Sequence, residues 1–291
     1  MPTISSGKVL VSGANGYVAV WVVRTFAREG YSVRCAVRST EKGTHLTQLY
    51  ASYGDKFELV IVPDITKAND PAELIEPAVK GTVAILESAR KYGTSVKRVV
   101  VTSSTAGIIQ EVTQKGREAF QAARYRASKV LAERAAWDFV AKHKDEISWD
   151  LSVMNPPLVL GPTIHEVPSA SALNTSARMM HDAFAKGEGL TTGGSWIDVR
   201  DLALAHVRAL QKAEAGGERI IVCAGAFLWQ DWLDAAPPGS KYQKGTPGAG
   251  KDVVHAIQYK NENGIRILGI RYRSMADTAA DVLGEYQARG W

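Results

Sequence analysis

One short segment near the start of the chain constrains the fold more than any other. Residues 8–12 form an apolar run that predicts a buried strand, and the spacing G-x-x-G-x-x-A follows at residues 13–19. The first glycine permits a sharp turn, the second admits a pyrophosphate against the backbone, and the small third residue lets a helix over 16–29 pack closely. The start of that helix offers N–H groups to phosphates, whereas the alternative is a glycine-rich turn without a ligand. The residues that we expect to contact a dinucleotide here are Gly13, Asn15, Gly16, Tyr17 and Val18.

Strand and helix patterns alternate after this turn. Further strands are predicted over 32–37, 57–62, 96–102 and 148–154, and further helices over 41–53, 71–92 and 124–144. Such alternation predicts an α/β chain with a Rossmann-like, doubly wound parallel sheet. After residue 155 Gly and Pro punctuate the pattern, leaving a helix over 201–212 and a strand over 219–223. We therefore expect a dinucleotide-binding domain over 1–155 and a smaller, mainly substrate-binding lobe over 156–291, with some segments returning to the first domain.

Composition narrows the class of protein. The chain has 291 residues, 45% of them hydrophobic and 22% charged, which suits a globular protein with a real core. Its net charge of +5 is spread without Lys-Arg runs, so we expect no nucleic-acid partner. Cys35 and Cys223 both lie in apolar stretches and are expected to be buried thiols. Without a leader or a bilayer-length apolar run, the expected location is cytoplasmic with no membrane partner. A monomer and a homodimer both remain open.

The end of the second strand distinguishes the two nicotinamide cofactors. An acidic residue there would bind the ribose 2′-hydroxyl of NAD, but this sequence has Arg38. A guanidinium suits a 2′-phosphate, so we expect NADPH/NADP+ as the cofactor, with Lys42 as a second positive contact. The alternative is that Arg38 is an ordinary solvated surface residue.

Three side chains form a candidate catalytic set. Tyr125 and Lys129 lie four residues apart on a predicted helix and therefore share a face. An ammonium there is expected to lower the phenol pKa and so assist Tyr125 as a general acid. Ser104 follows a strand end, where ligands bind in open α/β sheets, whereas Ser103 and Thr105 are expected only to cap their own loop. His165, His181 and His206 show no metal-ligand spacing, so no metal is expected.

These and neighbouring motifs resemble those of a known enzyme family. VSGANGYVA, VVVTSST, YRASK and Asn155-Pro156-Pro157 resemble the extended short-chain dehydrogenase/reductases, in the dihydroflavonol-reductase-like branch that includes fungal-type carbonyl reductases of aldehydes or methylglyoxal. The resemblance implies Ser104, Tyr125 and Lys129 as catalytic residues, with Lys129 also on the cofactor ribose. It implies that Asp64 and Ile65 contact adenine and that the Pro156 backbone orients the carboxamide. Hydride would pass to a carbonyl carbon while Tyr125 protonates the oxygen.

The sequence departs from this family in three places. Residues 64–71 pass directly from a strand to a helix, where the family has another helix and strand, and the chain also looks short over 110–124 and at 236/237. Either residues near 67/68 have been omitted, or the protein is truly shortened and is a poor or inactive enzyme. We favour omission because loss of a central strand leaves its neighbours' backbone groups unpaired. A Lys67–Ala68 Cα separation well above 3.8 Å would show it.

The function expected from these features is NADPH-dependent reduction of a ketone or aldehyde. A sugar-nucleotide epimerase or dehydratase of the same superfamily is one alternative, although Arg38 disfavours its tightly held NAD. A non-catalytic NADP-binding sensor or scaffold is another, although it does not need the Ser104-Tyr125-Lys129 set. Residues 163–180 and 227–232 are apolar candidates for the pocket, which predicts a small hydrophobic carbonyl substrate rather than a charged one. Asp201 is expected to be a helix N-cap.

Overall fold

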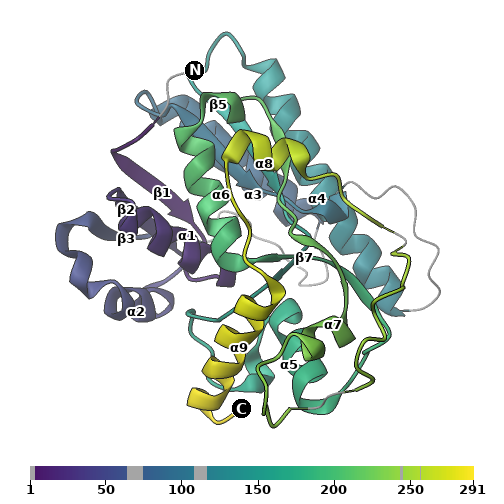
Figure 1. Ribbon diagram of the computed structural model, residues 1–291. Helices are drawn as coiled ribbons and strands as arrows, with labels where there is room; N and C mark the ends of the chain where they lie inside the picture. Colours follow the sequence, from purple (N-terminus) through teal and green to yellow (C-terminus); the bar gives the residue numbers. More distant parts are fainter. Residues whose placement is uncertain (1–3, 64–74, 108–116, 243–244, 256) are drawn as a thin grey trace.

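The computed structural model describes residues 4–63, 75–107, 117–242, 245–255 and 257–291, shown in Figure 1. It confirms the predicted α/β fold with parallel sheets. The first sheet has the order β1-β2-β3, all parallel, and pairs Ser12 with Ala36 at the carboxyl ends of β1 and β2. Its elements are β1 (Lys8–Ser12), α1 (Tyr17–Arg28), β2 (Ser32–Val37), α2 (Thr40–Leu49), the 3-10 helix η1 (Ala51–Lys56) and β3 (Phe57–Ile61).

The second sheet is also parallel and has helices on both faces. Its order is β4-β5-β8. Alternate side chains of β5 point to opposite faces, so Leu151 and Val153 pack against α3 and α4, while Met154 packs against α6 and α8. The elements are α3 (Ile75–Tyr92), β4 (Arg98–Thr102), η2 (Thr105–Gly107), α4 (Arg117–Lys142), β5 (Asp150–Asn155), α6 (Val199–Gln211), η4 (Ala213–Ala215), β8 (Arg219–Ile221) and α8 (Glu262–Leu268).

Helix α6 joins the two sheets. Ala203 and Val207 on one side of the helix belong to the core beneath the first sheet, together with α1. Leu202 and Ala205 on another side belong to the core around Met154. Figure 1 shows the first sheet, in purple, on one side of α6 and the second sheet on the other. Because β8 pairs with β5, a segment from beyond residue 155 does return to the first half of the chain.

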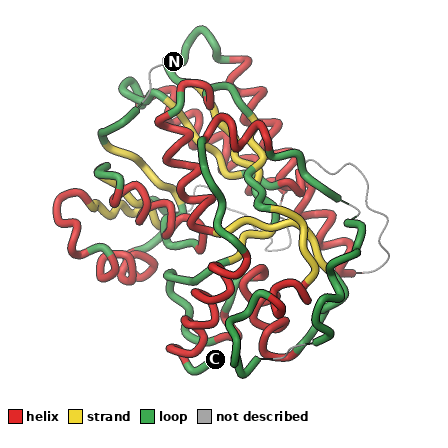
Figure 2. The backbone as a smooth tube through the Cα atoms, in the orientation of Figure 1, coloured by secondary structure: helices red, strands yellow, loops and turns green. Residues whose placement is uncertain are grey.

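The remaining elements form a mixed lobe at the lower end of the molecule in Figure 2. Strand β7 pairs in parallel with β6 and antiparallel with β9. An aromatic core holds this lobe together, with Trp196 packed edge-on against Trp232 at a ring-centroid distance of 4.7 Å. The elements are β6 (Leu158–Leu160), η3 (Ala170–Ala172), α5 (Thr175–Lys186), β7 (Gly193–Asp198), β9 (Gly225–Leu228), α7 (Trp229–Asp234) and α9 (Met275–Arg289).

The two parallel sheets are not joined through hydrogen bonds. Within the described ranges β1 pairs only with β2, and β4 pairs only with β5. Leu10, in the middle of β1, is 61% exposed, whereas a central strand of a parallel sheet is covered on both faces. The described residues therefore contain no strand between β1 and β4, as the short connection after residue 63 predicts.

The reason for that short connection stays open between the two explanations given above. The Lys67–Ala68 separation that would distinguish them lies outside the described residues. The omission of residues and a truly shortened chain both stay predictions.

The expected N-cap of α6 is corrected by the structure. The cap is Asp198, whose carboxylate accepts a hydrogen bond from the Arg200 N–H at 2.7 Å. Asp201 lies one turn inside the helix, where its carboxylate accepts from the Arg273 N–H and pairs with the Arg273 guanidinium. Both aspartates are structural, but the carboxylate nearer the free N–H groups of the helix start takes the capping position.

Two further expectations concern the cysteine thiols and membrane-spanning helices. Cys35 and Cys223 are buried free cysteines, as predicted. None of the helices in the described ranges is long and apolar enough to cross a membrane.

Candidate active site

The glycine turn lies at the carboxyl edge of the first sheet. Gly13 follows β1 with a φ of +59°, a left-handed conformation that favours glycine. The Gly16 N–H donates to the Gly13 carbonyl at 3.0 Å, and a Cβ on Gly16 would lie 3.3 Å from that same oxygen. Gly16 then caps α1 without a side-chain acceptor. The turn is therefore tight, and Gly16 has no side chain to cover the start of α1. The first N–H groups of the helix are left to bind an anionic ligand such as a phosphate.

Tyr17 and Val18 begin α1, and the Tyr17 side chain reaches the carboxyl-terminal lobe. The Tyr17 ring is buried, its hydroxyl donates to the Gly161 carbonyl at 2.8 Å, and burial raises its pKa well above the usual value. This side chain thus ties α1 to the carboxyl-terminal lobe, and only its backbone remains for a cofactor. Val18 is half-buried, and Asn15 is half-buried within the turn.

The residues expected at the adenosine end lie on the same edge. Arg38 directly follows β2, which pairs with β1, and it is exposed beside the turn. Lys42 is exposed in the first turn of α2. Asp64 and Ile65 lie outside the described residues. Arg38 and the glycine turn thus follow two paired strands of one sheet, and their contacts with the cofactor stay predictions.

Ser104 lies two residues beyond the end of β4. The Ser103 N–H donates to the Met154 carbonyl at 2.8 Å, which continues the pairing of β4 with β5. The buried Ser104 hydroxyl accepts from the Ala106 N–H at 3.1 Å and lies 3.4 Å from the Pro156 carbonyl. That carbonyl also accepts from the Thr105 N–H at 2.9 Å. Pro156 therefore anchors the serine loop, and its contact with a carboxamide stays a prediction.

Helix α4 brings Tyr125 and Lys129 to Ser104. Ser104 and Tyr125 line the same cavity, and the Lys129 ammonium lies 5.6 Å from the centroid of the Tyr125 ring. The three residues therefore lie close together. Partial burial raises the pKa of Tyr125, against the lowering effect of Ser104, and burial lowers the pKa of Lys129.

The pKa of Tyr125 therefore moves opposite to the sequence expectation. A nearby ammonium was expected to lower it, but partial burial raises the pKa, and Ser104 is the side chain that lowers it. A raised pKa keeps the phenol protonated at neutral pH. A protonated phenol can donate a hydrogen bond to a ligand in the cavity.

The lowered pKa of Lys129 gives a pH prediction. Below that pKa the ammonium is charged, so a reaction that needs it should lose rate as pH rises through a value under the usual 10.5. Lys129→Arg carries a cation that stays charged to far higher pH, so its falling limb should move upward. Profiles of kcat for ketone reduction at saturating NADPH, from neutral to pH 10, measure this. An identical limb in both proteins would contradict the assignment.

A buried carboxylate that sequence reasoning missed holds the site together. Glu133 lies one turn beyond Lys129, and its Oε2 accepts from the Ser103 hydroxyl and, at 2.9 Å, from the Asn155 amide. That amide also donates to the Ser104 carbonyl at 3.2 Å. The other carboxylate oxygen pairs with Arg219 of β8. Residue spacing could have indicated Glu133, because residues 125, 129 and 133 share one helix face.

A cavity of about 530 Å³ adjoins Ser104 and Tyr125, within the range of small-molecule sites. Of the two pocket segments expected from sequence, only Leu228 lines it. Phe227 and Trp232 lie in the aromatic core, and residues 163–180 lie elsewhere. The described lining is Ser104, Thr105, Ala106, Tyr125, Arg126, Pro157, Leu158, Gly193, Gly194, Ser195, Leu228, Val253, Val254, His255, Ile257 and Tyr259.

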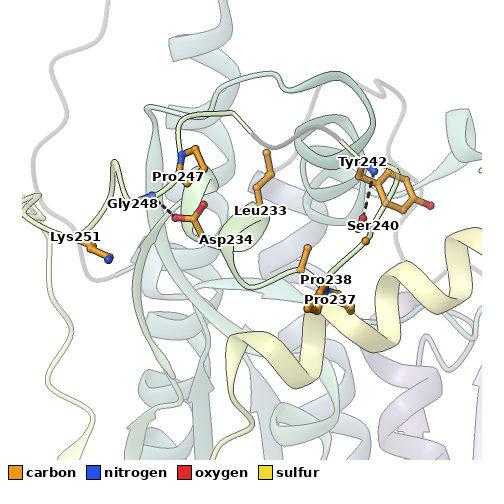
Figure 3. A pocket seen from close by; sticks show the side chains of 11 residues that line it. Leu233, Asp234, Pro237, Pro238, Ser240, Tyr242, Pro247, Gly248 and Lys251 are labelled. Carbon is orange, nitrogen blue, oxygen red and sulfur yellow. Dashed lines mark hydrogen bonds between the residues drawn. The ribbon is translucent and has the colours of Figure 1, made fainter.

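A second cavity, of about 390 Å³, shares no residue with the first. Figure 3 shows the side chains that line it, with Pro237 and Pro238 on one side, next to the junction that looks short in the sequence. Its one carboxylate, Asp234, accepts from the Gly248 N–H at 2.7 Å and from the Gln230 amide at 2.7 Å. Both oxygens are thus engaged in local structure, and we place the candidate site at the first cavity.

The histidines take ordinary structural positions. The His206 Nδ1 lies 2.8 Å from the Leu202 carbonyl, so it carries the proton, and Nε2 accepts from the Thr102 hydroxyl at 2.7 Å. Burial lowers the pKa of His165 to about 4. Among the described residues no group of three or more His, Cys, Asp or Glu side chains is arranged to hold a metal ion.

Comparison with known proteins agrees with this geometry. Residues 9–224 match the model of the NAD dependent epimerase/dehydratase family. A ketoreductase of Aspergillus niger is 31% identical over 95% of this chain and 96% of its own length. The NADPH-dependent methylglyoxal reductase of Saccharomyces cerevisiae is 30% identical over 95% of this chain and 97% of its own length. The crystal structure of yeast methylglyoxal/isovaleraldehyde reductase with NADPH superposes with a TM-score of 0.82 at 28% identity, covering 97% of this chain and 99% of that one.

These alignments also bear on the interrupted sheet. They extend over 327 and 333 positions, although this chain has only 291 residues. Both relatives therefore carry internal stretches that this chain lacks, as its short connections predict. The predicted resemblance to extended short-chain dehydrogenase/reductases and their fungal carbonyl-reductase branch is confirmed. The chain belongs to the NAD dependent epimerase/dehydratase family.

Proposed function

We propose that the protein reduces a ketone or aldehyde to an alcohol with NADPH. The observation that carries the proposal is that Ser104 and Tyr125 line one cavity, where Ser104 lowers the pKa of Tyr125 and the Lys129 ammonium lies 5.6 Å from the centroid of the Tyr125 ring. The names of the similar proteins support it, because one is a ketoreductase, one an NADPH-dependent methylglyoxal reductase, and the similar crystal structure contains NADPH.

The residues fit NADPH along the edge of the first sheet. The Gly13–Gly16 turn leaves backbone N–H groups open to a pyrophosphate, with Asn15, Tyr17 and Val18 contributing from the same turn. Arg38 and Lys42 add positive charge where the 2′-phosphate would lie. Lys129 would hold the ribose hydroxyls.

The chain's own residues then act on the substrate. Bound NADPH supplies a hydride to the carbonyl carbon. Ser104 donates a hydrogen bond to the carbonyl oxygen and polarises it. Tyr125 donates its proton to that oxygen as negative charge develops there, and the Lys129 ammonium stabilises the phenolate that remains.

A panel assay tests the proposal against its two rivals. With ketones and aldehydes, NADPH absorbance should fall, and NADH should serve poorly. A sugar-nucleotide epimerase or dehydratase would instead convert a nucleotide sugar without net consumption of NADPH. A sensor or scaffold would bind NADPH and turn over nothing, which would refute the proposed reaction.

Arg38 provides a test of cofactor choice. Arg38→Ala should raise KM for NADPH by roughly 10- to 100-fold, because a hydrogen bond to a charged group is lost, and should leave KM for NADH nearly unchanged. Arg28→Ala, an exposed arginine at the far end of α1, is the matched control. Equal effects of Arg38→Ala on both cofactors would contradict a 2′-phosphate contact.

A further inference from the structure

The described residues that line the cavity beside Ser104 and Tyr125 carry positive charge and no negative charge. They include Arg126 and no Asp or Glu. His255 lies on another wall of the same cavity and adds an imidazole N–H. Most of the rest is apolar, including Leu158, Leu228 and Val253. A ligand that fills this cavity contacts the Arg126 cation and the His255 hydrogen-bond donor, and the surface around them is mostly apolar.

Arg126 differs from several other arginines of the protein. Arg98, Arg200 and Arg273 each form an ion pair with an aspartate. Arg126 is half-buried, and within the described residues it has neither an ion pair nor a hydrogen bond. Its guanidinium is therefore available to pair with an anion in the cavity.

The position of Arg126 relates it to the reacting carbonyl. It directly follows Tyr125 on α4, so the two side chains leave the helix about 100° apart and line one cavity. A ligand in this cavity can therefore contact both Tyr125 and Arg126. A planar guanidinium binds a carboxylate through two parallel N–H bonds better than any other side chain does.

We propose that the substrate is an oxo acid: a carbonyl compound with an apolar body and a carboxylate that Arg126 binds. The inference rests on the proposed reductase function and specifies its substrate class. It replaces the expectation of an uncharged hydrophobic substrate, which relied on segments that mostly do not line the cavity. The apolar wall binds the hydrocarbon part, while Ser104 and Tyr125 bind the carbonyl oxygen.

The test compares an aliphatic 2-oxo acid with its own ethyl ester. The ratio of kcat/KM for acid to ester cancels the chemistry that the two share. Arg126→Gln should lower this ratio by roughly 10- to 100-fold through KM for the acid, with KM for NADPH unchanged. Arg126→Lys, which keeps the charge but not the paired bonds, should recover part of it. Arg134→Gln, an exposed arginine on the same helix, should leave the ratio within about two-fold.

The outcomes separate this inference from the proposed function. An unchanged ratio in Arg126→Gln would overturn the carboxylate site while leaving the reductase intact. A rise in KM for NADPH, equal with both substrates, would overturn it too, because Arg126 would then serve the cofactor. If neither compound nor any ketone is reduced, the proposed function fails, and calorimetric titration of the oxo acid into the NADP+ complex decides the inference alone. Binding weakened 10- to 100-fold by Arg126→Gln supports it, and equal affinity refutes it.

Discussion

Replacing Tyr125 with Phe should lower kcat for carbonyl reduction by roughly 100- to 10,000-fold, the usual contribution of a positioned general acid. The ring would still pack beside the Lys129 ammonium, so KM for NADPH should hardly change. The loss arises because the Tyr125 hydroxyl, which lies beside Ser104 in the cavity, is the proposed donor of the proton to the product oxygen. Steady-state kinetics at saturating NADPH measure it.

The matched control is Tyr92→Phe, which removes the same hydroxyl from an 80% exposed tyrosine at the end of α3. It should leave kcat unchanged. A Tyr125→Phe protein with full activity would remove the proton donor from the account, and Ser104 would have to be considered in its place.

Replacing Glu133 with Ala should lower the free energy of unfolding by about 3 kcal/mol. The Ser103 hydroxyl and the Asn155 amide would both lose a buried acceptor, and each unsatisfied group costs about 1–3 kcal/mol. We count little for Arg219, because its side chain is 43% exposed and water can replace the ion pair. Urea denaturation measures the change.

Glu133 also connects α4 to the serine loop, so kcat should fall with stability. Asp138→Ala removes an exposed carboxylate from the same helix and should change stability by at most about 0.5 kcal/mol. A Glu133→Ala protein as stable as the parent would show that the loop and helix are held by other contacts.

Much of the first half of the fold follows from local pattern. The strands at 8–12 and 32–37 were predicted at the observed bounds, because apolar runs between glycines and polar residues mark buried strands. Helix α2 ends at Leu49 rather than residue 53, and the chain continues as the 3-10 helix η1. The helical spacing continues through that segment, but hydrogen bonding changes to the tighter form, which a periodicity does not distinguish.

The second half was less predictable. Strands β6, β7 and β9 are short, and β7 begins with two glycines, so neither length nor alternation marks them. The wall formed by Val253, His255 and Tyr259 comes from a segment without regular structure. The position of this wall beside Ser104 depends on tertiary packing, which the spacing of residues in the sequence does not indicate.

The candidate site was predictable to different degrees. Tyr125, Lys129 and Ser104 come together because one helix turn and one strand end fix them, and both features are local. The direction of the Tyr125 pKa was predicted wrongly, because burial depends on neighbours that are distant in sequence. The contacts assigned to Asp64 and Ile65, and the domain boundary at 155/156, stay predictions.

The most direct test of the central claim follows the hydride itself. NADPH deuterated at both C4 positions is incubated with the protein and a ketone, and the product is examined by mass spectrometry and NMR. The expected product is an alcohol that carries one deuterium on the former carbonyl carbon, formed in proportion to the NADPH consumed. NADPH that binds yet leaves every ketone and aldehyde unlabelled would contradict the central claim.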